Sequence, residues 1–386
     1  MLPQHYQVNR RRAEDEDDDD NDDEEKRRTI GNRESSFTGS FRTPTASGSP
    51  QPPLGVTGVL CDTNSLSIRG RGTLQYTVFR PRYVRMKPPL VCLAGGPYLP
   101  WNYLSVLVHL INDRSLVFFD PIGCGQSKRI EDNNKNCSKD RNESLANNSN
   151  PVPEMVHDFT QSIQHLNLEH FHLFGHSFGG IVAYEALISK EIPGTCLSLI
   201  LSSTPANIPQ ALQEIDELKE ILKPEAQSST MEDLDHAVAH LFAERHECRV
   251  RPLPLQLQQS FAMAGFSSSP AGWQVVRDYV APLPSSDDDG KFKIPLLLLR
   301  GEFDFISEES MEPWWNCMEN SLSSDGPSPN NIVSVPGVAH YGMLEDEKSY
   351  GGILRSFLGQ VKEPALKIPT PKAPSTSQQR RSRLPS

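Results

Sequence analysis

The sequence predicts an α/β fold in which helices cover both faces of a mostly parallel central sheet, with a helical cap inserted into the second half. Two observations predict this fold. Short apolar runs bounded by Gly, Pro or Asp alternate with helical patterns along much of the chain, as strands buried on both faces of a parallel sheet do. The segment from about 206 to 290 has helical patterns and no strand, as expected of a cap over the edge of such a sheet.

The predicted strands form two groups. The first group, GVLCD, SLSIRG and GTLQYTVFRP, predicts an antiparallel start to the sheet. The second group consists of nearly continuous apolar runs at residues 88–95, 114–120, 170–176, 196–204, 294–301 and 331–337. Helical patterns such as MVHDFTQSIQHLN and GGIVAYEALISK separate several of these runs. This alternation of strand and helix predicts a layered α/β domain.

The same patterns divide the chain into five parts. Residues 1–54 are acidic and then rich in Ser and Pro, and residues 363–386 are basic and rich in Pro. Both segments lack sustained periodicity, so we expect a disordered arm and a tail. The core is expected at 55–205 and 291–362, with the cap at 206–290 between its two parts. Within the cap, helices are predicted at IPQALQEIDELKEIL, MEDLDHAVAHLFAERH and LPLQLQQSFAMAG.

Composition narrows the class of protein. The formal net charge is −11, but much of the acid lies in the run AEDEDDDDNDDEEKRR, so the charge says little about the folded part and no nucleic-acid partner is expected. No apolar run approaches the roughly 18 residues that cross a bilayer, and the first residues lack the apolar stretch of a signal peptide. The seven cysteines show no CxxC or metal-type spacing, which fits a reducing compartment. We therefore expect a cytoplasmic protein without a membrane partner.

The segment FGHSFGG, residues 174–180, carries the pattern G-x-S-x-G between a predicted strand and a predicted helix. This context is typical of a nucleophile elbow, a strained turn that projects a serine out of the sheet. Gly175 and Gly179 would let the strand and helix approach closely. Ser177 is the candidate nucleophile, and an ordinary Gly-rich turn is the alternative interpretation.

A serine hydroxyl needs a base that removes its proton and a carboxylate that orients the base. In α/β-hydrolases these partners follow the serine in the order Asp or Glu, then His. Asp304 follows the strand IPLLLLRG and His340 follows NIVSVPGVA, so both are expected at the carboxyl edge of the sheet with Ser177. Each could instead be a turn or surface residue, but the order of all three favours a catalytic triad.

An oxyanion hole is expected from two backbone amides, one after the nucleophile and one after an earlier strand. Phe178 would supply the first amide. LAGGPYLPW offers Gly95 and Gly96 for the second, whereas Pro97 has no N–H. A mechanism built from these groups needs no metal and no cofactor.

The chain resembles the proline iminopeptidase family of α/β-hydrolases over about residues 56–362. The resemblance rests on six segments in order: AGGPY, FFDPIGCGQS, GHSFGG, FAERHECRVRPLP, GEFD and GVAHYGMLED. It implies removal of an N-terminal residue, often proline, from short peptides through an acyl-enzyme. Ser177 would attack the scissile carbonyl, His340 would act as base and then acid, and Asp304 would orient the imidazole. FFDPIGCGQS lacks the ending of a phosphate-binding loop, and we interpret it as a structural turn.

Three positions depart from the family pattern. Ala94 stands where a histidine usually opens the Gly-Gly-Pro loop, Tyr98 replaces a glycine, and Phe305 stands where several members carry a glutamate. A glutamate there would meet the protonated α-amine of a peptide. Other cap acids that could replace it are Glu214, Glu217, Glu244 and Glu247. Cys248 is expected to be a packed cap residue.

Three functions therefore remain open. The first is a serine peptidase of the proline iminopeptidase type, acting on small peptides. The second is a carboxylesterase or thioesterase that uses the same triad on an ester substrate, which an uncharged wall at Phe305 favours. The third is a non-catalytic binding protein with a hydrolase fold, which the presence of all three triad residues disfavours.

Overall fold

The computed structural model describes eight parts of the chain: residues 58–82, 87–130, 150–227, 233–264, 273, 275–284, 292–320 and 332–364. The predicted arm and all but the first two residues of the predicted tail lie outside them. In the part of the chain that is described, no helix is long and apolar enough to cross a membrane.

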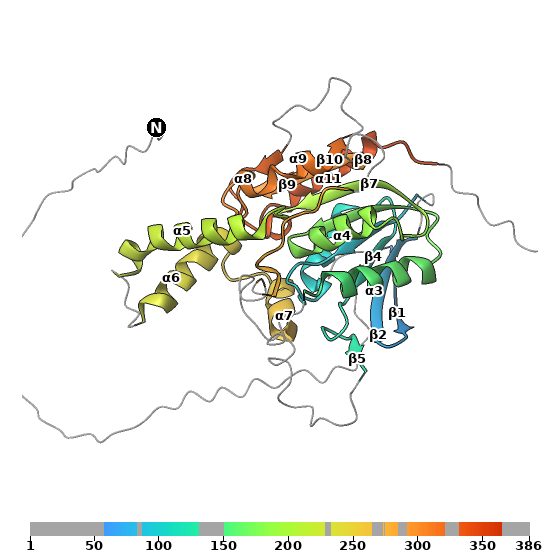
Figure 1. Ribbon diagram of the computed structural model, residues 1–386, viewed down its shortest axis with the longest axis horizontal. Coiled ribbons are helices and arrows are strands. Elements are labelled where there is room, and N and C mark those ends of the chain that lie inside the picture. Colours follow the sequence, from blue (N-terminus) through green and yellow to red (C-terminus); the bar gives the residue numbers. More distant parts are fainter. Residues whose placement is uncertain are drawn as a thin grey trace, which may run out of the picture. The chain divides into compact units, whose positions relative to one another are not determined.

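The central sheet is mixed and mostly parallel (Figure 1). Its strand order is β1-β2-β4-β3-β6-β7-β9-β11, and the two-residue strand β5 pairs with β2. The pairs β1–β2 and β2–β4 are antiparallel, and every later pair along this order is parallel. The strands are β1 Val59–Ile68, β2 Gly72–Pro81, β3 Leu90–Leu93, β4 Leu116–Phe119, β5 Lys128–Arg129, β6 His170–His176, β7 Thr195–Ser202, β9 Leu296–Gly301 and β11 Ile332–Val335. The predicted antiparallel start and parallel continuation are confirmed.

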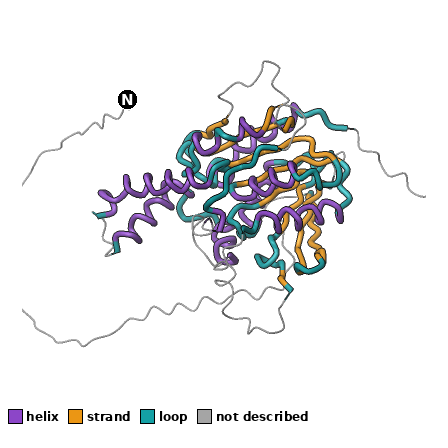
Figure 2. Tube along the Cα trace, viewed as in Figure 1, coloured by secondary structure: helices purple, strands orange, loops and turns teal. Residues whose placement is uncertain are grey.

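Helices cover both faces of this sheet, because successive side chains of each strand point to opposite faces. On β3, Val91 and Leu93 join one buried cluster, which includes residues of α3 (Val152–His165) and α4 (Phe178–Ile188). Leu90 and Cys92 join a second cluster, which includes residues of α1 and α11. The other core helices are η1 Trp101–Val106, α1 Leu107–Leu110, α8 Glu308–Met311, α9 Trp314–Cys317, α10 Gly342–Glu345 and α11 Glu347–Gln360. Figure 2 shows strands between helices throughout this region.

The segment between β7 and β9 is helical over much of its described length. It contains α5 Ile208–Ala226, α6 Leu234–Phe242, the π-helical turn η2 Ala243–Glu247 and α7 Leu255–Ala264. A short strand β8, Phe292–Ile294, follows and pairs with β10, Met318–Asn320, in a separate two-stranded sheet. Helices α5 and α6 pack against each other (Figure 1). Helix α7 contacts the core, since Ser260 Oγ donates to Pro100 O and accepts from Tyr103 N, both at 3.1 Å. The boundaries of a separate cap domain stay a prediction.

The Asp turn of FFDPIGCGQS is held by its own residues. Asp120 Oδ2 accepts from Gln126 N at 2.9 Å, and Ser127 Oγ donates to Asp120 O at 2.7 Å. Gly125 has φ +55°, and a Cβ there would lie 2.4 Å from Asp120 Oδ2. These contacts support its interpretation as a structural turn.

Candidate active site

Ser177 lies at a strained turn between β6 and α4. Its φ of 54° and ψ of −126° are unusual for a residue with a side chain. The turn is possible because neighbouring glycines leave no side chain in the way: a Cβ on Gly175 would lie 2.4 Å from Gly180 Cα, and one on Gly179 would lie 2.4 Å from Leu93 O. The serine is buried, and its Oγ has no hydrogen-bond partner among the described residues.

His340 and Asp304 meet just beyond the ends of β11 and β9. His340 Nδ1 lies 2.9 Å from Asp304 Oδ1, and both side chains are fully buried. Burial alone would raise the pKa of Asp304, but the charge and hydrogen bond of His340 hold that pKa below its usual value. Among the described residues, His340 Nε2 has no hydrogen-bond partner. In a neutral imidazole whose Nδ1 donates to Asp304, the lone pair is on Nε2.

Phe305 covers the imidazole. Its ring stacks on His340 with centroids 4.2 Å apart and an interplanar angle of 25°. Phe242 of α6 and Trp273 pack on Phe305 at centroid distances of 5.7 Å and 5.9 Å. Phe305 therefore belongs to a buried aromatic cluster and presents no charge beside the imidazole.

His176 is a site residue that the sequence interpretation missed. It is fully buried, and its Nε2 lies 2.9 Å from the carbonyl oxygen of His340, which can only accept a hydrogen bond. Nε2 therefore carries the proton, and Nδ1 accepts from Tyr103 OH at 2.9 Å. Burial, together with the nearby His340, lowers the pKa of His176 to about 3, so the ring is neutral. Its position directly before Ser177 was the available sequence signal.

The three predicted oxyanion amides differ in the structure. Gly95 N donates to Tyr103 OH at 2.8 Å, so this amide is already used. Gly96 has φ +127° and its carbonyl accepts from Trp273 Nε1, while its N–H has no acceptor among the described residues. Phe178 begins α4, so its N–H has no acceptor within that helix. Gly95 instead provides space, since a Cβ there would lie 3.0 Å from Ser177 Cβ. The expectation for Gly95 is corrected, because its amide is occupied; within the described residues the N–H groups of Gly96 and Phe178 have no acceptor.

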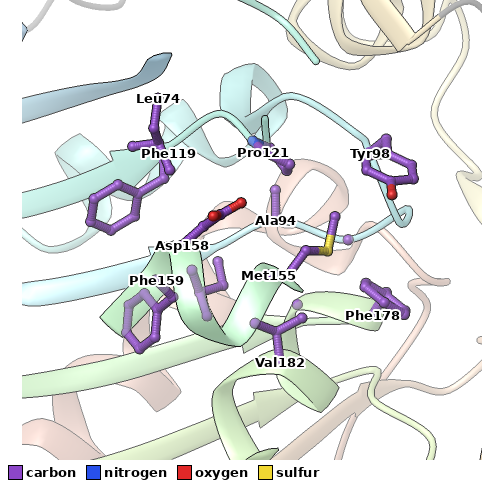
Figure 3. A pocket seen from close by; sticks show the side chains of 13 residues that line it. Leu74, Ala94, Tyr98, Phe119, Pro121, Met155, Asp158, Phe159, Phe178 and Val182 are labelled. Atoms are coloured by element: carbon purple, nitrogen blue, oxygen red, sulfur yellow. The ribbon is translucent and has the colours of Figure 1, made fainter. Parts of the chain in front are cut away.

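A cavity of about 50 Å³ opens beside Gly95 and Phe178 (Figure 3). Strands β2, β3 and β4 and helices α3 and α4 contribute to its wall. The lining residues are Leu74, Leu93, Ala94, Gly95, Tyr98, Phe119, Pro121, Met155, Asp158, Phe159, Phe178, Gly179 and Val182. Most of them are apolar, so this cavity suits an uncharged group.

The candidate amine-binding carboxylates of the inserted helices are partnered or neutral. Glu214 accepts from Ser307 Oγ at 2.7 Å, Glu217 from Gln213 Nε2 at 2.9 Å, and Glu244 from Arg251 Nε at 3.2 Å. Glu247 is buried with an unpaired Oε1, and burial raises its pKa to about 8. It is therefore mostly protonated at neutral pH and offers little negative charge.

The described residues contain no cluster of side chains that could hold a metal ion. Cys248 is buried, and burial raises the pKa of its thiol to about 12. A thiol with so high a pKa is a poor nucleophile. Ser177 is thus the better-placed nucleophile in this part of the molecule.

Comparisons with known proteins agree with the fold and with the family resemblance. A family model described as the alpha/beta hydrolase fold matches residues 88–246. The chain is 32% identical over 145 residues to a proline iminopeptidase of Lactobacillus acidophilus, which covers 37% of this chain and 45% of the relative. It is also 34% identical over 119 residues to a proline iminopeptidase of Clostridium botulinum. That match covers 31% of this chain and 36% of the relative. The chain thus spans less than half the length of these curated relatives.

Solved structures extend the likeness of the fold along more of the chain. The crystal structure of VinJ superposes with a TM-score of 0.60 at 18% identity and covers 78% of this chain and 99% of its own. The proline iminopeptidase of Mycobacterium smegmatis gives a TM-score of 0.56 at 20% identity, and the match covers 78% of this chain and 98% of that protein's chain. The chain therefore has the α/β-hydrolase fold and, within that fold, resembles the proline iminopeptidases.

Proposed function

We propose that this chain is a serine hydrolase that works through an acyl-enzyme. One observation carries the proposal: Ser177 Oγ and His340 Nε2 are buried polar atoms without a partner among the described residues, while the other nitrogen of His340 is bonded to Asp304. Buried polar groups are nearly always hydrogen-bonded. Ser177 directly follows His176, whose ring centroid lies 4.7 Å from that of His340. Two open polar atoms on these adjoining segments are expected when substrate atoms complete the bonding.

The proposed mechanism follows from these protonation states. His340 Nε2 takes the proton of Ser177 as Oγ attacks the substrate carbonyl. Asp304 accepts from Nδ1 and stabilises the imidazolium that forms. The N–H groups of Phe178 and Gly96 face the developing oxyanion. His340 then protonates the leaving group, and water releases the acyl group by the same steps in reverse.

Two substrate classes remain for this mechanism. The resemblance to proline iminopeptidases supports release of an N-terminal residue, such as proline, from short peptides. The aromatic cluster around Phe305 and the neutral Glu247 favour the second class, the uncharged carboxyl or thiol esters. A protonated amine would find little unpaired negative charge among these residues, and burying it would be costly.

The nucleophile is tested with a fluorophosphonate probe. We expect the wild-type protein to be labelled and Ser177→Ala to be unlabelled, with turnover lowered at least ~10³-fold because the covalent step is lost. Ser105→Ala, at a buried serine in η1, is the control and should be labelled like the wild type. An unlabelled wild type, or an equally labelled Ser177→Ala variant, would overturn the assignment.

The substrate class is tested by comparing rates on three compounds: a prolyl arylamide, the same arylamide with its amine blocked, and a p-nitrophenyl ester. A peptidase that recognises the free amine hydrolyses the first compound and loses activity on the second. An esterase hydrolyses the third fastest, whatever the state of the amine. If blocking the amine leaves the rate unchanged, the aminopeptidase interpretation fails.

A further inference from the structure

The cavity beside Gly95 and Phe178 is small and partly open, and its wall includes the first turn of α4, which follows the nucleophile turn. Figure 3 shows Tyr98 and Phe178 at one side of the cavity, with Leu74, Phe119 and Phe159 farther along its wall. A water molecule needs about 10–15 Å³ of such space. The 50 Å³ therefore holds about three or four non-hydrogen atoms.

The one carboxylate in the wall is already in an ion pair. Asp158 is buried and accepts from Arg71 Nε at 3.1 Å and from Arg71 Nη2 at 2.9 Å. The same guanidinium also contacts Glu154 at 2.6 Å. Apart from Asp158, which Arg71 already engages, the lining has no charged side chain, so an ammonium group placed there would lose its hydration with little compensation.

We propose that this cavity is the acyl pocket of the enzyme and that it binds the short, uncharged aliphatic part of the acyl group, about three or four carbons beyond the carbonyl. This inference rests on the proposed serine hydrolase function. It assigns the cavity to the acyl side because a small pocket of fixed size suits the part of the substrate that stays on the enzyme. A peptide, alcohol or thiol leaving group varies in length and must reach solvent.

The pocket fits the order of the chemical steps. Ser177 Oγ forms a bond to the carbonyl carbon, and the bond to the leaving group breaks as His340 supplies a proton. The acyl chain then lies beside Phe178 and Gly95, between α3 and α4. Water attacks the same carbon, the ester bond to Ser177 breaks, and the short carboxylic acid leaves.

The test is the rate on p-nitrophenyl acetate, butyrate, hexanoate and octanoate with pocket variants of the full chain. We expect the wild type to prefer butyrate. Met155→Ala enlarges the pocket and should raise the ratio of kcat/KM for hexanoate over butyrate about tenfold, since each buried CH₂ contributes about 0.8 kcal/mol. Val182→Phe fills the pocket and should shift the preference to acetate.

The matched control is Val156→Ala, because Val156 is on the same helix as Met155 and is half-buried but does not line the cavity. This variant should keep the wild-type preference. Thermal unfolding checks that each variant is folded, and if Val182→Phe fails to fold, Met155→Ala still decides. A second series consists of butyrate esters of alcohols of increasing length. The ratios of kcat/KM within this series should be unchanged by Met155→Ala.

A wild type that is labelled by fluorophosphonate but whose chain-length preference is unchanged by Met155→Ala would overturn the acyl pocket alone. If Met155→Ala changed the kcat/KM ratios in the alcohol series and not in the acyl series, the acyl pocket would also be overturned, and the cavity would be assigned to the leaving group. An unlabelled wild type without ester turnover would overturn the proposed function itself. A shift confined to the acyl series supports the pocket.

Discussion

His176 connects the two loops on which the proposed site depends. One ring nitrogen donates to the backbone of His340, and the other accepts from Tyr103 OH, which accepts in turn from Gly95 N. Each donor in this series of hydrogen bonds has one acceptor, so the neutral tautomer of His176 is fixed. The residue thus holds the loop of His340 against the Gly-Gly loop.

A neutral, buried His176 predicts a pH dependence of stability. Its pKa is about 3 in the folded protein, against about 6.5 when unfolded. Between these values the unfolded chain binds the proton, so stability is present above pH 6.5 and is lost as pH falls, by at most ~1.4 kcal/mol per pH unit from this group. His176→Gln keeps a donor and an acceptor but does not titrate. Its free energy of unfolding in urea should fall less between pH 6.5 and 4.5 than that of the wild type, and equal slopes would contradict the assignment.

At the scale of elements, the site depends on how closely α4 approaches β3. Gly179, in the first turn of α4, lies against the carbonyls of Leu93 and Ala94. A Cβ on Gly179 would lie 2.4 Å from Leu93 O and 2.5 Å from Ala94 O. These contacts are with backbone, which cannot rotate away. Helix α4 can therefore lie this close to β3 only because residue 179 has no side chain, and this close packing holds the nucleophile turn in place.

We expect Gly179→Ala to destabilise the protein by several kcal/mol or to prevent folding, because helix and strand would have to separate. Gly352→Ala is the matched control, since Gly352 is also within a helix, α11, but has nothing within 4 Å of a Cβ. That change should stabilise by roughly 0.5–1 kcal/mol, the usual gain of Ala over Gly in a helix. Urea unfolding of both variants measures the difference, and a similar small effect from both would mean that the close approach does not limit α4.

At the scale of the whole molecule, sequence patterns predicted the sheet well because burial on both faces leaves continuous apolar runs such as that of β9. They also identified Ser177, Asp304 and His340 as residues at strand ends. They did not distinguish Gly95 from Gly96, because the difference depends on Tyr103, which comes from η1. Such a contact between distant segments leaves no local pattern in the sequence.

The end of the described chain shows the same kind of distant contact. The core was predicted to end at residue 362, yet Glu363 accepts from Arg114 Nη1 at 2.9 Å. The Arg114 side chain is only 1% exposed, and His172 Nε2 lies 3.3 Å from the same carboxylate oxygen. Burial, with the charge of Arg114, lowers the pKa of His172 to about 3, so Glu363 pairs with the arginine rather than with an imidazolium.

Glu363→Gln should therefore destabilise the fold by about 1–3 kcal/mol, because a buried guanidinium loses its charged partner at this position. The loss stays below that of an isolated buried pair, since Asp113 also contacts Arg114. Lys362→Ala, one residue earlier at an exposed position, is the control and should change the free energy of unfolding by less than about 0.5 kcal/mol. Urea unfolding of the full chain at neutral pH compares the two variants. Equal, small effects would mean that the ion pair at Glu363 contributes nothing to the core, and a selective loss would place the end of the folded domain beyond residue 362.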